Sequence, residues 1–254
     1  MKLRHNAEQA SVLRKLREGS AKGVVPTDRL LRLATMPPFG RQILQELILQ
    51  SGDLKVPFAQ LEACSPEFPI VLLEVLDRCW DDLDHETISR LCAQASAEVL
   101  QVDDVKYRHA VALHRTGHVE DGLTLLRELI DNNPLDWYYY YASGNACRSK
   151  GDFKAARCYY ESAVNIEKGE SFIFCNLGLT LIDLKKYKQA IPILIKSLML
   201  EPDDSGCYTN LCKAYLGLGD LENAALAAEI ATDLAPDNPE ASDALRRVLE
   251  RQSR

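Results

Sequence analysis

Small and bulky apolar residues return at fixed places along residues 103–238, with a period of 34 residues. Dividing this segment at 137, 171 and 205 gives four units of equal length. The eighth place of the units holds Ala110, Gly144, Gly178 and Cys212, and the twentieth holds Gly122, Ala156, Ala190 and Ala224. The seventeenth place holds a larger apolar or aromatic residue, namely Val119, Phe153, Tyr187 and Leu221. Small residues at two fixed places let two helices approach closely, so each unit is predicted to be a helical hairpin.

The turns between the predicted helices have their own signals. Gly151–Asp152 and Gly219–Asp220 combine a residue that tolerates positive φ with one that caps the next helix. Proline near the end of a unit stops its second helix, and it occurs as Pro134, Pro202 and Pro236. A single hairpin of this size cannot bury its apolar face, so the hairpins are expected to stack into one continuous core.

The period, the small residues, the Gly-Asp-aromatic turn and the closing proline resemble the tetratricopeptide (TPR) repeat. The units 137–170 and 171–204 are close matches, whereas 103–136 has His109–Ala110 and 205–238 has Leu211–Cys212 where Leu-Gly is usual. The resemblance covers a little over half of the chain, and four repeats in register make it specific. It implies an all-α protein built as a right-handed α-solenoid of TPR-type hairpins.

Helices are also predicted on both sides of the repeats. Residues 1–65 are expected to form an N-terminal helical region with a small-residue linker at 19–25. Residues 66–102 are expected to form a divergent hairpin whose second helix covers about 85–101. Residues 239–254 are predicted to be a capping helix, with an apolar face on the last hairpin and a wet outer face.

The charge of the chain is acidic but uneven. The net charge is −7, and residues 1–50 carry nine Lys or Arg against four acids, a net of +5 that leaves −12 for the remainder. We interpret the basic excess as a solvated helix face, with docking onto an acidic partner or an anionic surface as the alternative. The acidic total argues against a nucleic acid partner.

Cysteine usage and hydropathy indicate the compartment. The eight cysteines include no C-x-x-C pair, so we interpret them as free thiols in a reducing compartment. The N-terminus has no apolar signal segment, and no stretch approaches the roughly 18 apolar residues of a membrane span. We therefore expect a cytoplasmic protein that is not inserted in a membrane.

A binding surface follows from the resemblance, which implies that the first helix of each hairpin lines a concave groove. The residues at its groove-facing places that we expect to bind a peptide are Asn145, Asn176, Asn210, Tyr107, Tyr138, Tyr141, Phe172, Arg148 and Lys213. An Asn amide offers two donors and an acceptor, so a row of them suits the backbone of an extended peptide. The aromatic residues would hold side chains. Tyr140 is expected in the hairpin core. The alternative is that these residues serve only helix surface and packing.

The TPR pocket that grips the C-terminal carboxylate of Hsp70/Hsp90-type chaperones provides a test of ligand type. Started at the second unit, its pattern requires Lys, Asn, Asn, Lys and Arg. The chain instead has Tyr141, Asn145, Asn176, Gly206 and Asn210. Two asparagines match and all three cations are missing, and a carboxylate without them lacks a strong partner. We therefore expect an aromatic, polar groove and no carboxylate clamp.

Signals for catalysis and cofactors are weak. His109, His114 and His118 lack a nearby cysteine or carboxylate to complete a metal site, and no nucleotide-binding or hydrolase motif is present. We predict a non-catalytic protein-interaction scaffold without a cofactor. The alternatives are a dedicated chaperone resembling those of type III secretion, a structural subunit of a larger complex, and an enzyme with its site in residues 1–100.

Overall fold

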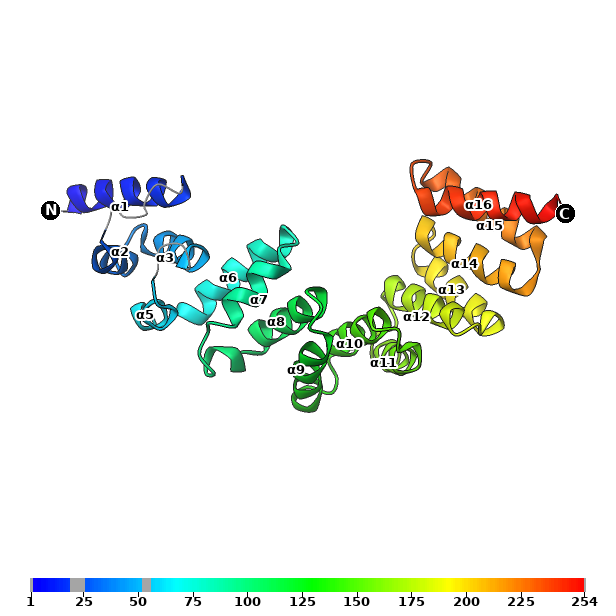
Figure 1. Ribbon diagram of the computed structural model, residues 1–254, viewed down its shortest axis with the longest axis horizontal. Coiled ribbons are helices and arrows are strands. Elements are labelled where there is room, and N and C mark those ends of the chain that lie inside the picture. Colours follow the sequence, from blue (N-terminus) through cyan, green and yellow to red (C-terminus); the bar gives the residue numbers. More distant parts are fainter. Residues whose placement is uncertain (1, 19–25, 52–55, 254) are drawn as a thin grey trace. The chain divides into compact units, whose positions relative to one another are not determined.

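The computed structural model describes residues 2–18, 26–51 and 56–253, with side chains from residue 6 onward. Within these ranges the chain forms fifteen α-helices and one short 3₁₀ helix, and no strand (Figure 1). This confirms the predicted all-α class. The chain divides into two compact units, residues 1–125 and 126–254, which are described separately below. The linker predicted at 19–25 lies outside the described residues.

Unit one contains the helices before the repeats and the first helix of the repeats. They are α1 (Lys2–Arg17), α2 (Thr27–Ala34), α3 (Gly40–Leu49), α5 (Phe58–Cys64), α6 (Phe68–Asp81), α7 (His85–Cys92), η1 (Val99–Gln101) and α8 (Asp103–Arg115). Helix α9 (Val119–Asn132) contains the boundary between the two units.

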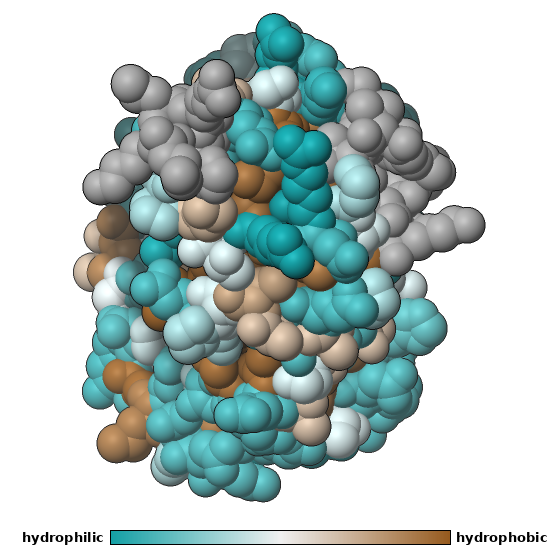
Figure 2. All heavy atoms as spheres, turned by 90° about the vertical axis from the view of Figure 1, so that its left-hand side faces the viewer, coloured by the Kyte–Doolittle hydropathy of each residue, from teal (hydrophilic) through white to brown (hydrophobic). Residues whose placement is uncertain are grey.

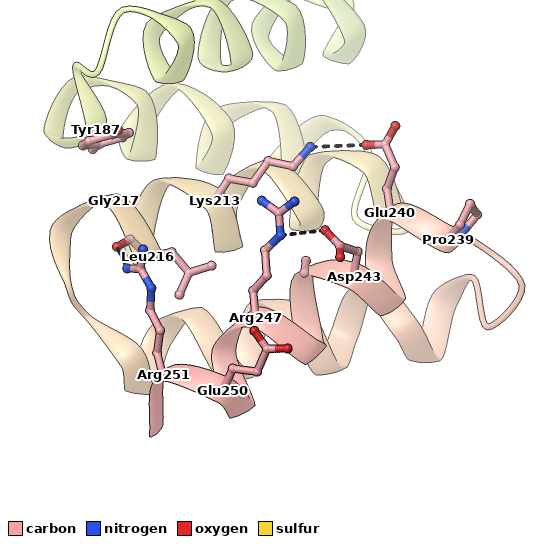
Figure 3. Close-up of a pocket in the computed structure, with 11 residues that line it drawn as sticks. Tyr187, Lys213, Leu216, Gly217, Pro239, Glu240, Asp243, Arg247, Glu250 and Arg251 are labelled. Carbon is pink, nitrogen blue, oxygen red and sulfur yellow. Dashed lines mark hydrogen bonds and ion pairs between the residues drawn. The ribbon is translucent and has the colours of Figure 1, made fainter. Parts of the chain in front are cut away.

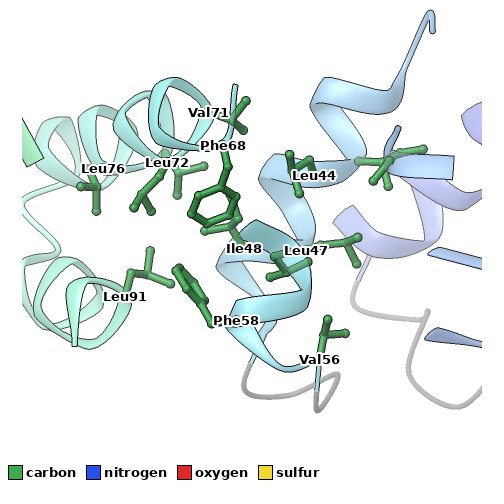
Figure 4. Packing of buried hydrophobic residues seen from close by; sticks show 14 of the residues in the cluster. Leu44, Leu47, Ile48, Val56, Phe58, Phe68, Val71, Leu72, Leu76 and Leu91 are labelled. Carbon is green, nitrogen blue, oxygen red and sulfur yellow. The ribbon is translucent and has the colours of Figure 1, made fainter. Parts of the chain in front are cut away.

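The core of unit one is centred on α3, which packs against α1, α2 and α6. Figure 4 shows Leu47 and Ile48 of α3 in the same buried cluster as Phe58 and Phe68. The two phenylalanine rings meet edge to face, with their centroids 5.4 Å apart. Fully burying an aliphatic or aromatic side chain stabilises a fold by about 1.5–3 kcal/mol. A continuous apolar core of this kind holds α1 to α8 together.

Polar side chains reinforce this core at a few buried points. The Nε2 of Gln9, which is fully buried, donates to the Leu33 carbonyl oxygen at 3.0 Å and so ties α1 to the end of α2. The buried carboxylate of Glu46 lies 3.5 Å from Arg17 and 3.7 Å from Arg78. Burying this charge is tolerated because two guanidinium groups accompany it.

The basic N-terminal segment is partly neutralised within unit one. Arg29 lies 2.6 Å from Glu8, and Arg41 lies 2.6 Å from Glu74. Figure 2 looks onto the end of the molecule that carries α1 and α2, where hydrophilic side chains separate the hydrophobic patches.

The helix predicted over 85–101 is shorter than expected. Helix α7 ends at Cys92, and a 3₁₀ turn follows at Val99–Gln101. The backbone N–H of Ser96 donates to Glu62 Oε1 at 2.7 Å, and the Ser96 hydroxyl accepts from the Val99 N–H at 3.3 Å. These bonds replace the helical partners of two N–H groups, so the prediction was wrong beyond Cys92.

Unit two is a series of three antiparallel hairpins and a final helix (Figure 1). The helices are α10 (Trp137–Ser149), α11 (Phe153–Ile166), α12 (Ser171–Asp183), α13 (Tyr187–Leu200), α14 (Ser205–Leu218), α15 (Leu221–Leu234) and α16 (Pro239–Gln252). Helix α16 packs against both α14 and α15.

Glycine permits close contact inside two of these hairpins. A Cβ on Gly144 would lie 2.6 Å from the ring of Tyr160, and one on Gly178 would lie 2.5 Å from the side chain of Leu194. Real Cβ atoms do not approach so closely, so a larger residue at either place would force the facing side chain or the helix to move. The small residues at the eighth place therefore set the hairpin distance.

The turns use the predicted chemistry in two of the three hairpins. Gly151 has φ +84° and Gly219 has φ +78°, and Asp152 and Asp220 each accept a hydrogen bond from the N–H three residues later. In the third hairpin Lys185 occupies the glycine place with φ +59°. A left-handed conformation costs a residue with a Cβ about 1–2 kcal/mol, so this turn is strained.

Candidate functional site

The first helices of unit two, α10, α12, α14 and α16, form the surface that we call the first-helix face. At its N-terminal end, four aromatic rings form what we call the aromatic cluster: Trp137, Tyr138, Tyr141 and Phe172. Trp137 stacks on Tyr138 with ring centroids 3.8 Å apart, and Tyr141 meets Phe172 edge to face at 5.0 Å. The side chain of Tyr138 is 51% exposed. The cluster therefore presents ring surface and phenol groups to solvent.

The aromatic run also holds one correction. Tyr139, and not Tyr140, is buried in the hairpin, with 8% of its surface exposed. Tyr139 shares its helix face with Ala142, Ser143 and Ala146, which are also buried. The hydroxyl of Tyr140 instead donates to the Pro134 carbonyl oxygen at 3.1 Å, in the turn before α10. The structure places Tyr138 and Tyr141 in the aromatic cluster, on the first-helix face.

The three predicted asparagines lie on the first helices and make hydrogen bonds within the chain. Asn145 Oδ1 accepts from the Tyr160 hydroxyl at 2.6 Å. Asn176 Nδ2 donates to the Tyr141 hydroxyl at 3.0 Å, and Asn210 Nδ2 donates to Cys175 Sγ at 3.4 Å. The last two bonds join neighbouring first helices, so these asparagines also fix the spacing of the repeats. Asn210 is the most enclosed of the three, with 7% of its surface exposed.

Both predicted cations of unit two are paired with acids on the following first helix, which is two helices later in the chain. Arg148 Nε lies 3.2 Å from Asp183 Oδ2, and Lys213 Nζ lies 3.2 Å from Glu240 Oε2. Partly exposed pairs of this kind contribute about 0–1 kcal/mol to stability. They leave the first-helix face close to neutral at these two places, which fits the expectation of an aromatic and polar surface.

Tyr107, the remaining predicted residue, belongs to unit one. Its ring lies 6.1 Å from the ring of Trp80, between α8 and α6. The neighbouring Arg108 pairs with Asp77 of α6. The structure thus brings Tyr138, Tyr141, Phe172 and the asparagines together in unit two, and it places Tyr107 on α8 of unit one.

A pocket of about 750 Å³ opens between α14 and α16 on the first-helix face. Figure 3 shows the side chains that line it, which come mainly from these two helices. They are Lys213, Leu216, Gly217, Pro239, Glu240, Asp243, Ala244, Arg247, Glu250 and Arg251, with Tyr187 from α13. Sequence reasoning assigned α16 only a capping role, although its groove-facing places follow from the same period counted on from Pro239.

Charges in this pocket are ordered by contacts with the same two helices. Arg247 Nε lies 2.7 Å from Asp243 Oδ2. Arg251 Nη1 donates to the Leu216 carbonyl oxygen at 2.9 Å, where a cation suits the negative end of α14. The pKa of Asp243 lies below its ordinary value, because Arg246 donates a hydrogen bond to it and Arg247 adds positive charge. The pocket therefore presents fixed charges of both signs around the apolar side chains of Leu216 and Ala244.

Two cysteines and a carboxylate meet where α14 begins, and sequence reasoning missed this cluster. The Sγ atoms of Cys175 and Cys207 and a carboxylate oxygen of Asp204 lie within 4.8 Å of one another. The interaction between the two thiols lowers the pKa of Cys175, and the same interaction together with burial raises the pKa of Cys207. Spacing along the sequence gave no signal, because Cys175 lies far from Asp204 and Cys207 along the chain.

His109 and His114, two of the histidines considered above as metal ligands, are partly buried. Burial lowers the pKa of His109 and of His114, which favours the neutral form of both side chains. Among the described residues, no helix combines the length and the hydrophobicity needed to cross a bilayer.

Comparisons with known proteins connect this architecture to a family. Family models described as "Tetratricopeptide repeat" match residues 107–170 and 181–248, together just over half of the chain. The Hsp70-Hsp90 organizing protein of Triticum aestivum is 33% identical over 97 residues, which cover 38% of this chain and 17% of that protein. The chain thus spans less than a fifth of the length of the first curated relatives it matches.

Solved structures share the fold. YrrB, described as a TPR protein with an unusual peptide-binding site, is 14% identical with a TM-score of 0.58, over 74% of this chain and 97% of that one. MamA from Desulfovibrio magneticus RS-1 is 24% identical with a TM-score of 0.56, over 59% of this chain and 85% of that one. At these identities the likeness concerns the solenoid fold alone.

Proposed function

The chain belongs to the tetratricopeptide repeat family, and from that premise we propose that it is a non-catalytic adaptor that binds a segment of another protein. The segment lies along the first-helix face of unit two. The observation that carries this proposal is that the aromatic cluster and the pocket between α14 and α16 lie on the same series of first helices. One end of the face is rich in aromatic rings, and the other has a cavity with ordered charges.

The aromatic cluster is proposed as the side-chain anchor. Tyr138 is 51% exposed at the start of α10, and it is held by stacking on Trp137. A rigid aromatic surface with a polar tip binds apolar side chains at low entropic cost, and such residues dominate many interfaces. Tyr141 and Phe172 extend this surface toward α12, and Tyr107 is proposed to play the same role on α8.

The asparagines are proposed as partners for the backbone of the segment. Asn176 is half-buried, and its bonds to Tyr141 and to the Phe172 carbonyl oxygen use the amide nitrogen. A peptide N–H would approach the carbonyl oxygen of the same amide, which accepts hydrogen bonds. Asn210 likewise bonds through its amide nitrogen, so its oxygen would accept from the peptide. Asn145 already uses its oxygen to accept from Tyr160, so its amide nitrogen would donate to a peptide carbonyl instead. Arg148 and Lys213 flank the row as paired charges.

An internal segment fits this face better than a free C-terminus. The cations of a carboxylate clamp are replaced by Tyr141, Gly206 and Asn210, and Arg148 is already paired with Asp183. A carboxylate brought here would exchange water for no new cation. The relation to an Hsp70-Hsp90 organizing protein therefore supports protein binding without supporting that mode of recognition.

The proposed location is a cytoplasm or another reducing space. All eight cysteines are free thiols in the structure, including the half-buried Cys64 and the exposed Cys158. Disulfides accumulate in oxidising compartments, whereas free thiols persist where glutathione and thioredoxin keep them reduced. The cysteine chemistry supports this location.

The test is to select peptides from a phage-displayed random library on the full chain, and then to measure the dissociation constant of one synthetic peptide by calorimetry. The variant Tyr138→Ala with Phe172→Ala should weaken binding at least tenfold, about 1.4 kcal/mol. The matched control is Met199→Ala, which removes a 78% exposed apolar side chain from α13, a second helix. Equal affinities for all three proteins would refute the proposal.

Two of the alternative functions, a structural subunit and a dedicated chaperone, would give other outcomes in the same experiment. A structural subunit that docks through second helices or N-terminal helices would lose its partner in variants there and keep it in the aromatic double variant. A dedicated chaperone would retain one client and prevent its aggregation, but it would select no common motif from a random library.

A further inference from the structure

Three groups with metal-ligand chemistry converge at the start of α14. Cys175 comes from the middle of α12, Asp204 is the N-cap of α14, and Cys207 lies in the first turn of that helix. Their ligand atoms, two thiol sulfurs and one carboxylate oxygen, all lie within 4.8 Å of one another. Helix packing brings these groups together from two repeats.

Each of the three side chains is held in place by its own hydrogen bond. Asp204 Oδ1 accepts from the backbone N–H of Cys207 at 2.9 Å. Cys175 Sγ accepts from Asn210 Nδ2 at 3.4 Å, and the Cys207 thiol donates to the Leu194 carbonyl oxygen at 3.4 Å. Cys207 is fully buried, whereas Cys175 and Asp204 are partly exposed, so the cluster has a closed inner side and an open outer side.

We propose that Cys175, Asp204 and Cys207 bind one thiophilic divalent metal ion, with Zn²⁺ as the natural candidate. Two thiolates and a carboxylate form a ligand set that Zn²⁺ accepts, at distances of about 2.3 Å to sulfur and about 2.0–2.2 Å to oxygen. Sulfur ligands disfavour Mg²⁺ and Ca²⁺. Ligand atoms around such an ion lie roughly 3.5–4 Å apart in tetrahedral geometry, so small side-chain movements close the site.

Binding changes the protons and bonds at the site in a defined way. The two thiols lose their protons to solvent, and three ligand charges of −1 meet an ion of +2, which leaves the site with a net charge of −1. The positive end of α14 stabilises the two thiolates and the carboxylate. A water molecule or the side-chain oxygen of Asn210 completes four ligands on the open side.

Occupation of the site would act on the first-helix face. The ion links α12 to α14 at the place where Asn210 now donates to Cys175 Sγ. A metal-bound thiolate still accepts hydrogen bonds, so the ion would add a link between the two helices without breaking the bond from Asn210. The proposed metal site does not depend on peptide binding, so a separate measurement of metal binding tests it.

The experiment uses the full chain, reduced and freed of metal with a chelator. Cd²⁺ is the probe, because its thiolate complexes absorb in the ultraviolet, and Zn²⁺ affinity follows from competition with a chromophoric chelator. We expect one ion per chain and a higher melting temperature with metal, since a ligand that binds the native state stabilises it. Less than half an equivalent of bound Cd²⁺ would overturn the proposal.

Three variants and one control assign the ligands. Cys175→Ser should abolish the high-affinity thiolate band, and this residue is partly exposed, so the fold should survive. Asp204→Asn keeps an equally good N-cap but removes the charge, so Zn²⁺ affinity should fall at least tenfold. Cys207→Ser should also abolish the band. Cys158→Ser, an exposed cysteine on α11, should bind as the unmodified chain does. Unchanged binding in Cys175→Ser would place the ion elsewhere and overturn the assignment.

Discussion

The amide nitrogen of Asn176 donates to the hydroxyl of Tyr141 across 3.0 Å, and this bond joins α12 to α10. One repeat later, Asn210 reaches Cys175 in the same way. The sixth place of a repeat thus bonds to the fifth place of the repeat before it. A side chain chosen for ligand binding by sequence reasoning also holds neighbouring repeats in register.

The bond between Asn176 and Tyr141 should have a measurable coupling energy. Asn176→Ala is expected to lower the free energy of unfolding by about 1 kcal/mol, because a hydrogen bond between partly buried groups is lost. With Tyr141→Phe and the double variant, urea unfolding gives the coupling term, for which we expect about 0.5–1 kcal/mol. Additive effects of the two substitutions would mean that the bond does not support the stack.

The close packing of α10 on α11 gives a second prediction. Gly144→Ala puts a Cβ 2.6 Å from the Tyr160 ring, so we expect a loss of about 1–3 kcal/mol in unfolding free energy. Gly206→Ala is the matched control, since Gly206 is exposed near the start of α14. A Cβ added there would lie 3.2 Å from its nearest neighbour, the side chain of Asp204. Thermal unfolding should show a lower midpoint for the first variant and an unchanged or higher midpoint for the second.

The strained turn before α13 gives a third prediction, which concerns Lys185. Lys185 has φ +59° where two other hairpins have glycine, so Lys185→Gly should raise the free energy of unfolding by about 0.5–1 kcal/mol. Lys188→Gly, three residues later inside α13 and also exposed, should lower it by a similar amount. A lower stability for Lys185→Gly would show that the turn is not strained.

The half-buried His109 of the first repeat predicts a pH dependence of stability. Burial lowers the pKa of His109 in the folded state, so the unfolded state takes up its proton first as the pH falls. Stability is therefore fully present above the ordinary histidine pKa of about 6.5 and is lost as the pH falls below it toward the folded-state value. His109→Leu should show a smaller drop in melting temperature between pH 7 and pH 5 than the unmodified chain. An identical drop in both proteins would assign the dependence to other groups.

The repeat pattern predicted the hairpins of unit two because its signals are local. Gly144 and Gly178 stand where helices touch, and Asp152 and Asp220 cap helices within three residues of themselves. Sequence reasoning failed where distant contacts decide the result. Helix α7 ends early because Ser96 bonds to Glu62, which lies 34 residues earlier in the sequence.

The candidate site shows the same limit. A run of aromatic residues has no polar contrast, so its pattern did not distinguish the buried Tyr139 from Tyr140. The cluster of Cys175, Asp204 and Cys207 has no motif because helix packing assembles it. The sequence predicted only a capping helix over 239–254, whereas Arg247 of this helix lines the pocket between α14 and α16.

The most direct test of the account locates the bound peptide on the first-helix face. A photo-crosslinking phenylalanine derivative is placed at Tyr138 in one full-length protein and at Met199 in another, and each is irradiated with the selected peptide. Binding on the first-helix face predicts a cross-link to the peptide from position 138, competed by unlabelled peptide, and none from position 199. A specific cross-link from position 199 with none from position 138 would contradict it.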